Sequence, residues 1–558
     1  MLVGVLAGGA SLAWCSANGE SGGVWPAVVT LLGSAAVYLV FSQPRNRKFF
    51  PLVPLGILFS VFAASQLRDS SGDGLGAHVE QVHRHAAGLE FHPSLLSPMS
   101  GRPALFSMAV FPAAGFSLES GKWVHFALAL AGGLMLGAAV HEITGSRPGS
   151  LVAALMAILQ PALLYQAATF YQDGILVGAV TIFFASILRF FSAPGWRTAM
   201  SLLLALVTVA WAKKTGLVQA AWMALLLPPA FFFLRRSMVP FRSFLGAVLV
   251  ISPILALTLL SWPMPRENQK VLNGFLQLVR PLVDARGLDP GGSGGIHGGC
   301  GEVSPHAPVM YWKRNFTASK RGEDGRGIKP PFWFTRPELD VFSDLTPDLR
   351  FGGYGPLYPT AFFLSMTPGL WLLVAGSRRQ AGWMWILAAC LFLIPLTPSW
   401  WARWFPQGWW IPLAACVGFL CGAPDWRAKF KWVGWLARLG LLALGLNSLL
   451  IFVFTAKGYF EAEAIIRRQL AFLKTLPAPL EIETGHFTAT RFWLDQEKIP
   501  YRQKEIPADA VSLVMYRTTL KIQLSEGDLE RLQRDPDHFR SLQKHKLLNL
   551  PRPSQPSA

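Results

Sequence analysis

A polar stretch at residues 67–104 concentrates the side chains best suited to chemistry. Apolar runs lie on both sides of it, so these side chains stand at the exit of an expected membrane span. Ionisable groups at the boundary of a membrane segment point to function more often than to structure. The acids and imidazoles of this stretch are Asp69, Asp73, Glu80, Glu90, His78, His83, His85 and His92.

Asp73, which stands between two glycines, is the strongest single candidate in the stretch. A carboxylate at the mouth of a membrane span can act as a general base. Residues 76–87 are compatible with a surface helix on which His78 and His85 share a face, as roughly do Glu80 and Arg84 at i, i+4. For any one of these residues the alternative is a solvated loop with a polar face.

A divalent metal is a further possibility for this stretch. Imidazole and carboxylate groups such as His78 and Glu80 are suitable ligands. The spacing HxxxxHxH is, however, no established zinc pattern, and histidines that face solvent are common. No cofactor is therefore certain, and the metal ligands stay unknown.

Three other polar elements interrupt apolar sequence. Asp173 begins an apolar helix, where it could be a simple end-cap favoured by the helix dipole. Lys213 and Lys214 stand between two apolar runs and suit a phosphate, although they could instead anchor the chain on anionic lipids. Arg403 lies among tryptophans typical of a membrane interface, and its guanidinium suits a bidentate phosphate contact.

The composition predicts the elements that position these residues. Of 558 residues, 52% are hydrophobic and 15% are charged, whereas charged residues approach roughly a quarter of soluble proteins. We expect a mostly α, polytopic membrane protein. The net charge of +18 comes from short Lys and Arg clusters between apolar runs, which indicate topology and not nucleic-acid binding. Five scattered cysteines without a CxxC predict no disulfide framework.

About thirteen apolar runs approach the twenty or so residues needed to cross a bilayer. The first could instead be a signal peptide, but it lacks a basic beginning. The runs lie near 2–16, 24–42, 50–66, 120–140, 149–166, 173–192, 197–212, 215–234, 239–262, 358–376, 380–397, 404–422 and 432–456.

The basic loops fix an orientation for these spans. With thirteen spans they all fall on one side, which the positive-inside rule makes cytoplasmic. The basic residues concerned are Arg45, Arg47, Lys48, Arg147, Arg189, Arg197, Arg235, Arg236, Arg378, Arg379, Arg427, Lys429 and Lys431. Three segments are left outside: 67–119, 264–357 and the tail from 457.

We expect a transmembrane domain over 1–456 and a small outer α/β domain over 457–558. In the tail the pattern predicts a helix over 459–474, a strand at LEIET, a helix around ATRFWLDQEKI, a strand at AVSLVMY and a charged helical end. The loop 264–357 is rich in Gly and Pro and could close over a substrate, with the glycines of FGGYGPLYP at 351–359 permitting hinge-like motion. The absence of an internal repeat weighs slightly against transporters built from repeated halves.

In the order of these elements the chain resembles the GT-C superfamily of integral-membrane glycosyltransferases. It is most similar to the branch of protein O-mannosyltransferases and the lipid A aminoarabinose transferase. The elements that carry the resemblance are DGLGAHVEQVHRHAAG at 73–88, FYQD at 170–173, KTGL at 214–217 and RWFP at 403–406. The chain departs from the family pattern by two additional spans before the first outer loop, by Gly74 in place of Glu, and by Trp404 in place of Tyr.

The resemblance implies inverting transfer of a sugar from a polyprenyl-phosphate donor to a lipid, glycan or protein acceptor. It implies a multi-pass protein of the plasma (inner) membrane in the cell envelope, with membrane lipids as neighbours and an active site on the outer or periplasmic face. The residues that would act are Asp73 as base, Asp173 as a positioning acid, Lys213, Lys214 and Arg403 on the leaving phosphate, and His78 and Glu80 as substrate contacts.

Other functions remain open from sequence. A transporter or flippase of lipid-linked saccharides would use the same charges along a path, but the expected spans four to nine carry almost no polar residues deep inside. A membrane-anchored scaffold would use the outer tail as its binding module and would need no acid at position 73. An oligosaccharide polymerase or ligase would be a close enzymatic relative.

Overall fold

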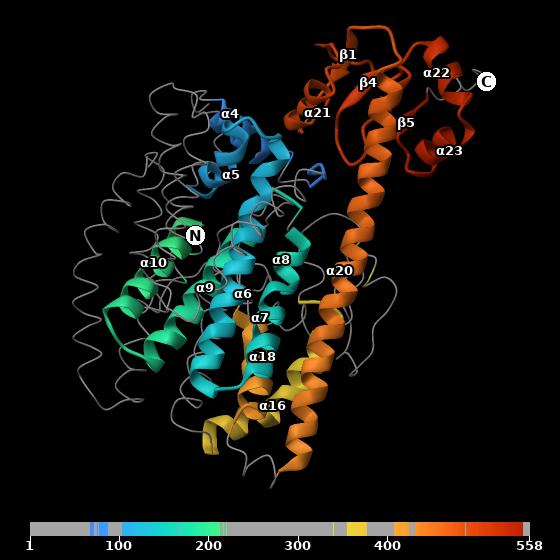
Figure 1. Cartoon of the computed structure of the whole chain (residues 1–558). Helices are drawn as coiled ribbons and strands as arrows, with labels where there is room; N and C mark the ends of the chain where they lie inside the picture. The colour runs from blue at the N-terminus through green and yellow to red at the C-terminus, as the bar shows by residue number, and fades with distance from the viewer. Residues whose placement is uncertain are drawn as a thin grey trace, which may run out of the picture.

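The structure is a computed structural model, and in the part of the chain that it describes it is mostly helical with one small sheet (Figure 1). The residues described are 67–71, 75, 78–87, 103–166, 168–212, 216, 219, 339, 354–375, 407–422, 430–485 and 487–550.

The helices form a bundle from which one long helix extends to a small α/β domain at the C-terminal end (Figure 1). The helices of the bundle are α4 (Val79–Ala86), α5 (Pro103–Ala113), the 3₁₀ helix η4 (Leu118–Lys122), α6 (Trp123–Thr144), α7 (Arg147–Ile158), α8 (Pro161–Gln166), α9 (Gln172–Ser192), α10 (Trp196–Ala212), α16 (Tyr358–Ala375), α18 (Gln407–Leu420) and α20 (Lys431–Leu473).

Helices α6 and α9 lie parallel at the centre of the bundle, in contact through small residues. A Cβ atom on Gly178 would lie 2.6 Å from Cβ of Leu128, and one on Gly132 would lie 2.7 Å from a methyl group of Thr181. Small residues that allow backbones this close are typical of helix packing in membranes. Because the two helices are parallel, their first turns meet at the same end of the bundle.

The turn between α6 and α7 follows from the sequence SRPG. Helix α6 ends at Gly145, whose φ of 67° is easily adopted only by glycine, and whose N–H donates to the carbonyl of His141 at 2.8 Å. Ser146 then caps α7 by accepting the N–H of Gly149 at 3.2 Å. The left-handed Gly145 ends α6 and the N-cap Ser146 begins α7 directly after it, so the chain reverses its direction here. Helix α7 therefore packs antiparallel to α6.

Helix α20 is the longest element described. It contains 43 residues, which corresponds to about 65 Å, whereas the apolar core of a bilayer is about 30 Å thick. The expected span over 432–456 and the expected helix over 459–474 are therefore one continuous helix. Its second half carries the C-terminal domain (Figure 1).

Five helical segments among the described residues are long and apolar enough to cross a membrane, which identifies the chain as a membrane protein. They are Leu118–Thr144, Arg147–Gln166, Gln172–Ser192, Tyr358–Ala375 and Lys431–Leu473. The expected runs 120–140, 149–166, 173–192, 197–212, 358–376, 404–422 and 432–456 coincide with apolar helices. The remaining expected runs lie wholly or mostly outside the described residues, so the total of thirteen stays a prediction.

The C-terminal domain contains a five-stranded sheet in the order β2-β1-β4-β3-β5. Its strands are β1 (Leu480–Glu483), β2 (Tyr501–Gln503), β3 (Ser512–Val514), β4 (Lys521–Gln523) and β5 (Leu548–Asn549), followed or flanked by helices α21 (Arg491–Gln496), α22 (Glu526–Gln533) and α23 (Pro536–Lys544). Only β1 and β2 pair in parallel. Ile522 at the centre of β4 faces Ile482 and Leu513 on its two neighbours, which places an apolar row at the middle of the sheet.

The core of this domain continues into the bundle end. Its buried cluster contains residues of the sheet, the second half of α20, and Leu75 and Ala168 from the bundle. Leu75 is fully buried there. Leu75, in the polar stretch 67–104, therefore packs against the core of the C-terminal domain and does not lie in solvent.

A buried amide holds the segment before α16. Asn447 of α20 accepts the N–H of Leu357 and donates to the carbonyl of Tyr354, both at 2.8 Å. Tyr354 and Tyr358 are fully buried. The described part of the expected hinge over 351–359 is thus fixed inside the bundle, because Asn447 satisfies backbone groups that would otherwise be unpaired in an apolar setting.

Replacing Asn447 with leucine should therefore destabilise the bundle. The N–H of Leu357 and the carbonyl of Tyr354 would lose their partners, at about 1–3 kcal/mol for each group left unsatisfied. Thermal unfolding of the purified protein in detergent, followed by light scattering and fluorescence, should show a lower midpoint. The neighbouring exposed Leu446, changed to alanine, is the control, and an equal effect of both variants would contradict this role of Asn447.

Candidate functional site

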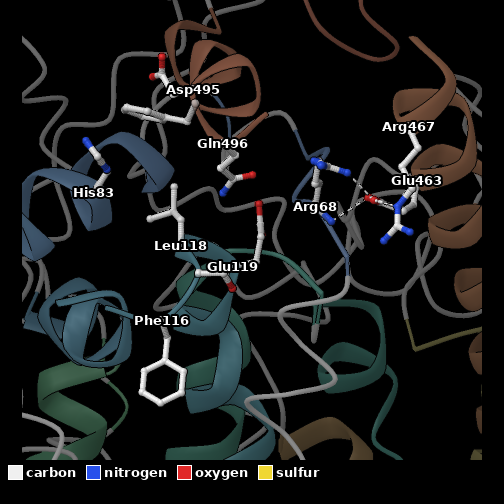
Figure 2. A pocket seen from close by; sticks show the side chains of 11 residues that line it. Arg68, His83, Phe116, Leu118, Glu119, Glu463, Arg467, Asp495 and Gln496 are labelled. Atoms are coloured by element: carbon white, nitrogen blue, oxygen red, sulfur yellow. Dashed lines mark hydrogen bonds and ion pairs between the residues drawn. The ribbon is translucent and has the colours of Figure 1, made fainter. Parts of the chain in front are cut away.

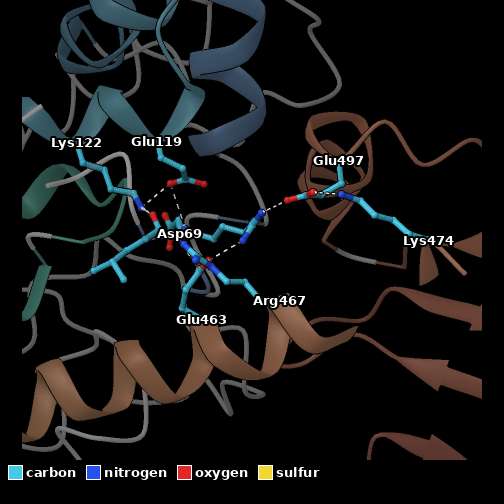
Figure 3. A network of polar contacts seen from close by, with 9 residues as sticks. Asp69, Glu119, Lys122, Glu463, Arg467, Lys474 and Glu497 are labelled. Carbon is cyan, nitrogen blue, oxygen red and sulfur yellow. Dashed lines mark hydrogen bonds and ion pairs between the residues drawn. The ribbon is translucent and has the colours of Figure 1, made fainter. Parts of the chain in front are cut away.

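Asp69 lies at the end of the bundle with its carboxylate fully buried. Its Oδ2 accepts the N–H of Phe170 at 2.7 Å, and its Oδ1 accepts the N–H of Ser71 at 2.8 Å. The N–H of Asp69 itself donates to Glu119 at 3.2 Å. Asp69 thus joins residues 67–71 to the turn before α9 and, through Glu119, to the start of α6 (Figure 3).

Glu119 and Lys122 form a buried ion pair beside Asp69. They are three residues apart in η4, which leads directly into α6, and this spacing puts both side chains on one side of the turn. Lys122 also donates to the carbonyl of Leu67 at 2.7 Å and lies over the ring of Phe170, 5.4 Å from its centroid. One ammonium group therefore faces two carboxylates.

Burial raises the pKa of Asp69 above its usual value of 3.8, and Lys122 and the hydrogen bonds from Ser71 and Phe170 oppose that rise in part. A carboxyl group with a raised pKa is better suited to exchange protons near neutral pH. Asp69 is therefore an acid that takes up a proton at a higher pH than a solvated aspartate does.

Arg68 connects this carboxylate cluster to the C-terminal domain. Its guanidinium pairs with Glu463 of α20 at 2.6 Å and with Glu497, just after α21, at 2.5 Å. Its N–H also donates to Glu463 at 3.0 Å. The network continues to Arg467 and Lys474, each 2.6 Å from its carboxylate (Figure 3).

A cavity of about 500 Å³ opens beside the cluster (Figure 2). Pockets that bind small ligands usually have volumes of about 300–1,000 Å³. Glu119 lines the cavity and at the same time accepts the N–H of Asp69. The residues around it are Arg68, His83, Phe116, Ser117, Leu118, Glu119, Glu463, Arg467, Phe492, Asp495 and Gln496.

Two of the residues expected from sequence lie at this bundle end. Asp173 is buried in the first turn of α9, three residues after the Phe170 that binds Asp69. His78 is buried and meets Tyr171 edge to face, with ring centroids 6.1 Å apart. The structure therefore brings Asp69 and His78 together with the segment that leads into Asp173.

Glu80 has a different position from the one its sequence suggested. It accepts hydrogen bonds from Thr488 and Arg491 of the C-terminal domain, both at 2.8 Å, and is buried. A partner more than 400 residues away in the chain cannot be read from local spacing. In the structure Glu80 holds the C-terminal domain against α4.

The histidines of α4 are packed and not solvated as a group. His85 stacks on Phe106 with centroids 3.9 Å apart, and burial lowers its pKa to about 4. His83 lies 4.2 Å from the ring of Phe492, and burial lowers its pKa as well. Both imidazoles are therefore neutral at pH 7. In the described part of the chain, no three His, Cys, Asp or Glu side chains are grouped to hold a metal ion.

Asp73, Lys213, Lys214 and Arg403 lie outside the described residues. Described residues a few positions after Lys214 and after Arg403 nevertheless contact each other or helix α9. Gln407 donates to Gln219 at 3.0 Å, and a Cβ atom on Gly216 would lie 2.9 Å from a methyl group of Leu176, one turn into α9.

The sequence prediction missed Glu119, Lys122 and the partners of Arg68. A local signal for the first two existed, because LESGK places two charges at the start of an apolar helix, where ionisable side chains are costly and tend to be functional. For Arg68 no such signal existed, since its partners Glu463 and Glu497 are distant in sequence.

Comparison of the chain with known proteins identifies no relative. No protein-family model, no curated protein and no solved structure matches the chain.

Proposed function

We propose that the chain is a membrane glycosyltransferase that moves a sugar from a polyprenyl-phosphate donor to an acceptor at the outer face of the membrane, with inversion. The observation that carries the proposal is the buried group of Asp69, Glu119 and Lys122 beside a ligand-sized cavity at the end of an apolar bundle. Such a site offers carboxylates and a water-poor environment next to the place where a lipid-linked substrate would lie.

In the proposed reaction the acceptor hydroxyl attacks the anomeric carbon while the bond from that carbon to the phosphate oxygen breaks. The phosphate keeps the bonding electrons and leaves as polyprenyl phosphate, and the hydroxyl proton passes to a carboxylate. Asp73 remains our candidate for this base. It follows Asp69 by four residues and precedes the buried Leu75 by two.

Asp69 is then a positioning residue. Its hydrogen bond to Phe170 fastens the stretch that carries Asp73 to the turn that carries Asp173. Glu119 lines the cavity and can contact the acceptor, and Asp173 orients the acceptor or the sugar. Accurate placement of reacting groups contributes strongly to rate, and a shift of about 1 Å can cost a hundredfold.

The leaving phosphate is a good anion that needs stabilisation of its charge more than a proton. Lys213 or Lys214 and Arg403 are the groups we propose for it. In support, the contacts of Gly216 with Leu176 and of Gln219 with Gln407 bring residues near the two basic elements into the bundle.

The outer location is also part of the proposal, as are the thirteen spans and the inner-membrane setting. Arg189 at the far end of α9 pairs with Glu142 at the far end of α6, at 3.0 Å. The cluster at Asp69 lies at the opposite end, where these parallel helices begin. Under the positive-inside rule the end with Arg147, Arg189 and Arg197 is cytoplasmic, which leaves Asp69 outside.

Asp73→Asn should lower kcat by about a hundredfold or more, because removal of a general base typically costs 10²–10⁴ in rate. Transfer can be measured in proteoliposomes with synthetic polyprenyl-phosphate sugars of several kinds and extracted lipids and glycans as acceptors. Asp537→Asn, at an exposed position of α23, is the matched control. Full activity of the Asp73 variant would remove that residue from the mechanism.

Asp69 should produce an acidic limb in the pH dependence of kcat. Its pKa is raised by burial, so the carboxylate that holds Phe170 is lost at a pH above the ordinary 3.8. In Asp69→Asn this limb should become shallower but not vanish, because Glu119 is a second buried carboxyl group and the proposed base Asp73 must still be ionised. The variant should also have a lower kcat at neutral pH, because the amide is a weaker acceptor for the Phe170 N–H.

The pH profile of that variant separates a positioning role from a merely structural one. A raised native pKa means that ionisation of Asp69 opposes folding, so its contribution to stability is most favourable below about pH 4 and declines as pH rises from 3.8 to the native pKa. Asp69→Asn removes this ionisation cost, but its NH2 group would face one of the two backbone N–H groups that the carboxylate accepts, so thermal unfolding at pH 7 should show a lower midpoint than for the wild type. A destabilised variant with an unchanged pH profile would contradict the assignment.

A further inference from the structure

The cavity beside Glu119 is built by segments from both ends of the chain. Arg68 and His83 come from the first outer stretch and Phe116 to Glu119 from the turn before α6, whereas α20 and α21 of the C-terminal part close the other side (Figure 2). It therefore exists only while the C-terminal domain is docked on the bundle. This arrangement is typical of ligand sites, which often lie between domains.

The charges around the cavity do not suit an anion. Its lining contains the guanidinium groups of Arg68 and Arg467 and the carboxylates of Glu119, Glu463 and Asp495, so the net charge is −1. Arg68 is already paired with Glu463 and Glu497. A phosphate or a carboxylate ligand would find no unopposed positive charge among these lining residues.

The same groups do suit hydroxyls. Carboxylates accept hydrogen bonds, guanidinium groups donate them, and the amide of Gln496 can do both. A ligand with many hydroxyl groups can donate and accept at neighbouring positions and needs no charge of its own. A site built for hydroxyls also discriminates strongly against analogues that lack them, because its polar groups would be left unpaired.

Part of the wall is apolar. Leu118 and Phe492 line the cavity, and the Phe492 ring lies against His83 with centroids 4.2 Å apart, whereas the ring of Phe116 points away from the other lining side chains (Figure 2). An aromatic surface beside convergent polar groups favours a ligand with one apolar face and a hydroxylated edge. A pyranose ring has this property, since its C–H groups form a face and its hydroxyls form the rim.

Glu119 connects the cavity to the carboxylates of the candidate site. Its carboxylate lines the cavity and accepts the N–H of Asp69 at 3.2 Å. A ligand held in the cavity would therefore present a hydroxyl directly to that cluster.

We propose that this cavity binds a neutral saccharide unit of the acceptor, oriented by Phe492 and by the carboxylates of Glu119 and Asp495. The inference rests on the proposed glycosyl transfer and adds the class of acceptor. It also separates the two substrates, because the donor phosphate would bind at Lys213, Lys214 and Arg403 and not in this cavity.

The test is photo-crosslinking of the full chain in lipid nanodiscs. The probes are octyl glycosides of glucose, galactose, mannose and N-acetylglucosamine, each with a diazirine on the sugar, and labelled peptides are located by mass spectrometry. We expect label in the peptides around Glu119 and around Asp495 with at least one probe. Absence of label there with every probe would overturn the proposal.

Competition identifies the chemistry and the source of the ligand. The free neutral disaccharide or the unlabelled octyl glycoside should displace the probe, whereas glucose 6-phosphate should not. Equal displacement by both neutral competitors indicates a soluble glycan, and displacement by the octyl glycoside alone indicates a lipid-borne one. Either result supports a neutral saccharide site, and stronger displacement by the phosphate would contradict it.

Two variants locate the site on the proposed residues. Phe492→Ala and Asp495→Ala should each weaken labelling about tenfold, which corresponds to a loss of about 1.4 kcal/mol for an aromatic contact or a hydrogen bond to a charged group. Asp495→Lys, which changes the net charge of the lining to +1, should favour glucose 6-phosphate. Asp537→Asn on the exposed surface of α23 is the control and should leave labelling unchanged.

The outcomes distinguish this inference from the proposed function. If the cavity is labelled but no sugar is transferred, the saccharide site is supported and the proposed glycosyltransferase activity is contradicted. If sugar is transferred to an acceptor that contains no neutral saccharide and the cavity is not labelled, the activity is supported and the saccharide site is contradicted. Thermal unfolding of each variant shows whether a loss of labelling reflects misfolding.

Discussion

The burial of Asp69 is the constraint on which the arrangement of this bundle end depends. A carboxylate without exposure to water loses its hydration, and that cost must be offset by hydrogen bonds and opposite charge. The N–H groups of Ser71 and Phe170 and the ammonium group of Lys122 provide this. Each comes from a different segment, so the hydrogen bonds and charge around one side chain hold residues 67–71, the start of α6 and the turn before α9 together.

The sequence predicts the fold best where one local pattern decides it. The apolar runs predict the membrane helices, and the strand and helix patterns of the tail correspond to β1, β3 and α21. The sequence predicts the fold poorly where contacts with distant residues determine the local structure. Strands β2 and β4 are three residues each, with sequences YRQ and KIQ that have no strand signal of their own, and they form because β1 and β3 offer edges to pair with. The polar sequence after residue 456 likewise does not end α20, because the packing of the C-terminal core continues it.

The candidate site follows the same division. Asp173 and His78 could be expected at one end of the bundle, because topology brings the ends of successive spans together, and the structure places them there. Glu80 could not be assigned its partners Thr488 and Arg491 from any local pattern. A polar face on a short helix is the same signal whether water or a distant domain covers it, and only the fold distinguishes the two.

The distribution of charge along the helices bears on the choice between transfer and transport. A path for a saccharide through the membrane requires polar groups along the length of several spans. In the described bundle the ionisable groups gather at the ends: Asp69, Glu119, Lys122 and Asp173 at one, Glu142 and Arg189 at the other. Between these two ends, α6 and α9 pack through glycines so closely that an added Cβ atom would clash with the neighbouring helix, which leaves no room for a ligand between these two helices. A central path between this helix pair is therefore sterically closed, whereas chemistry at the Asp69 end needs no such path.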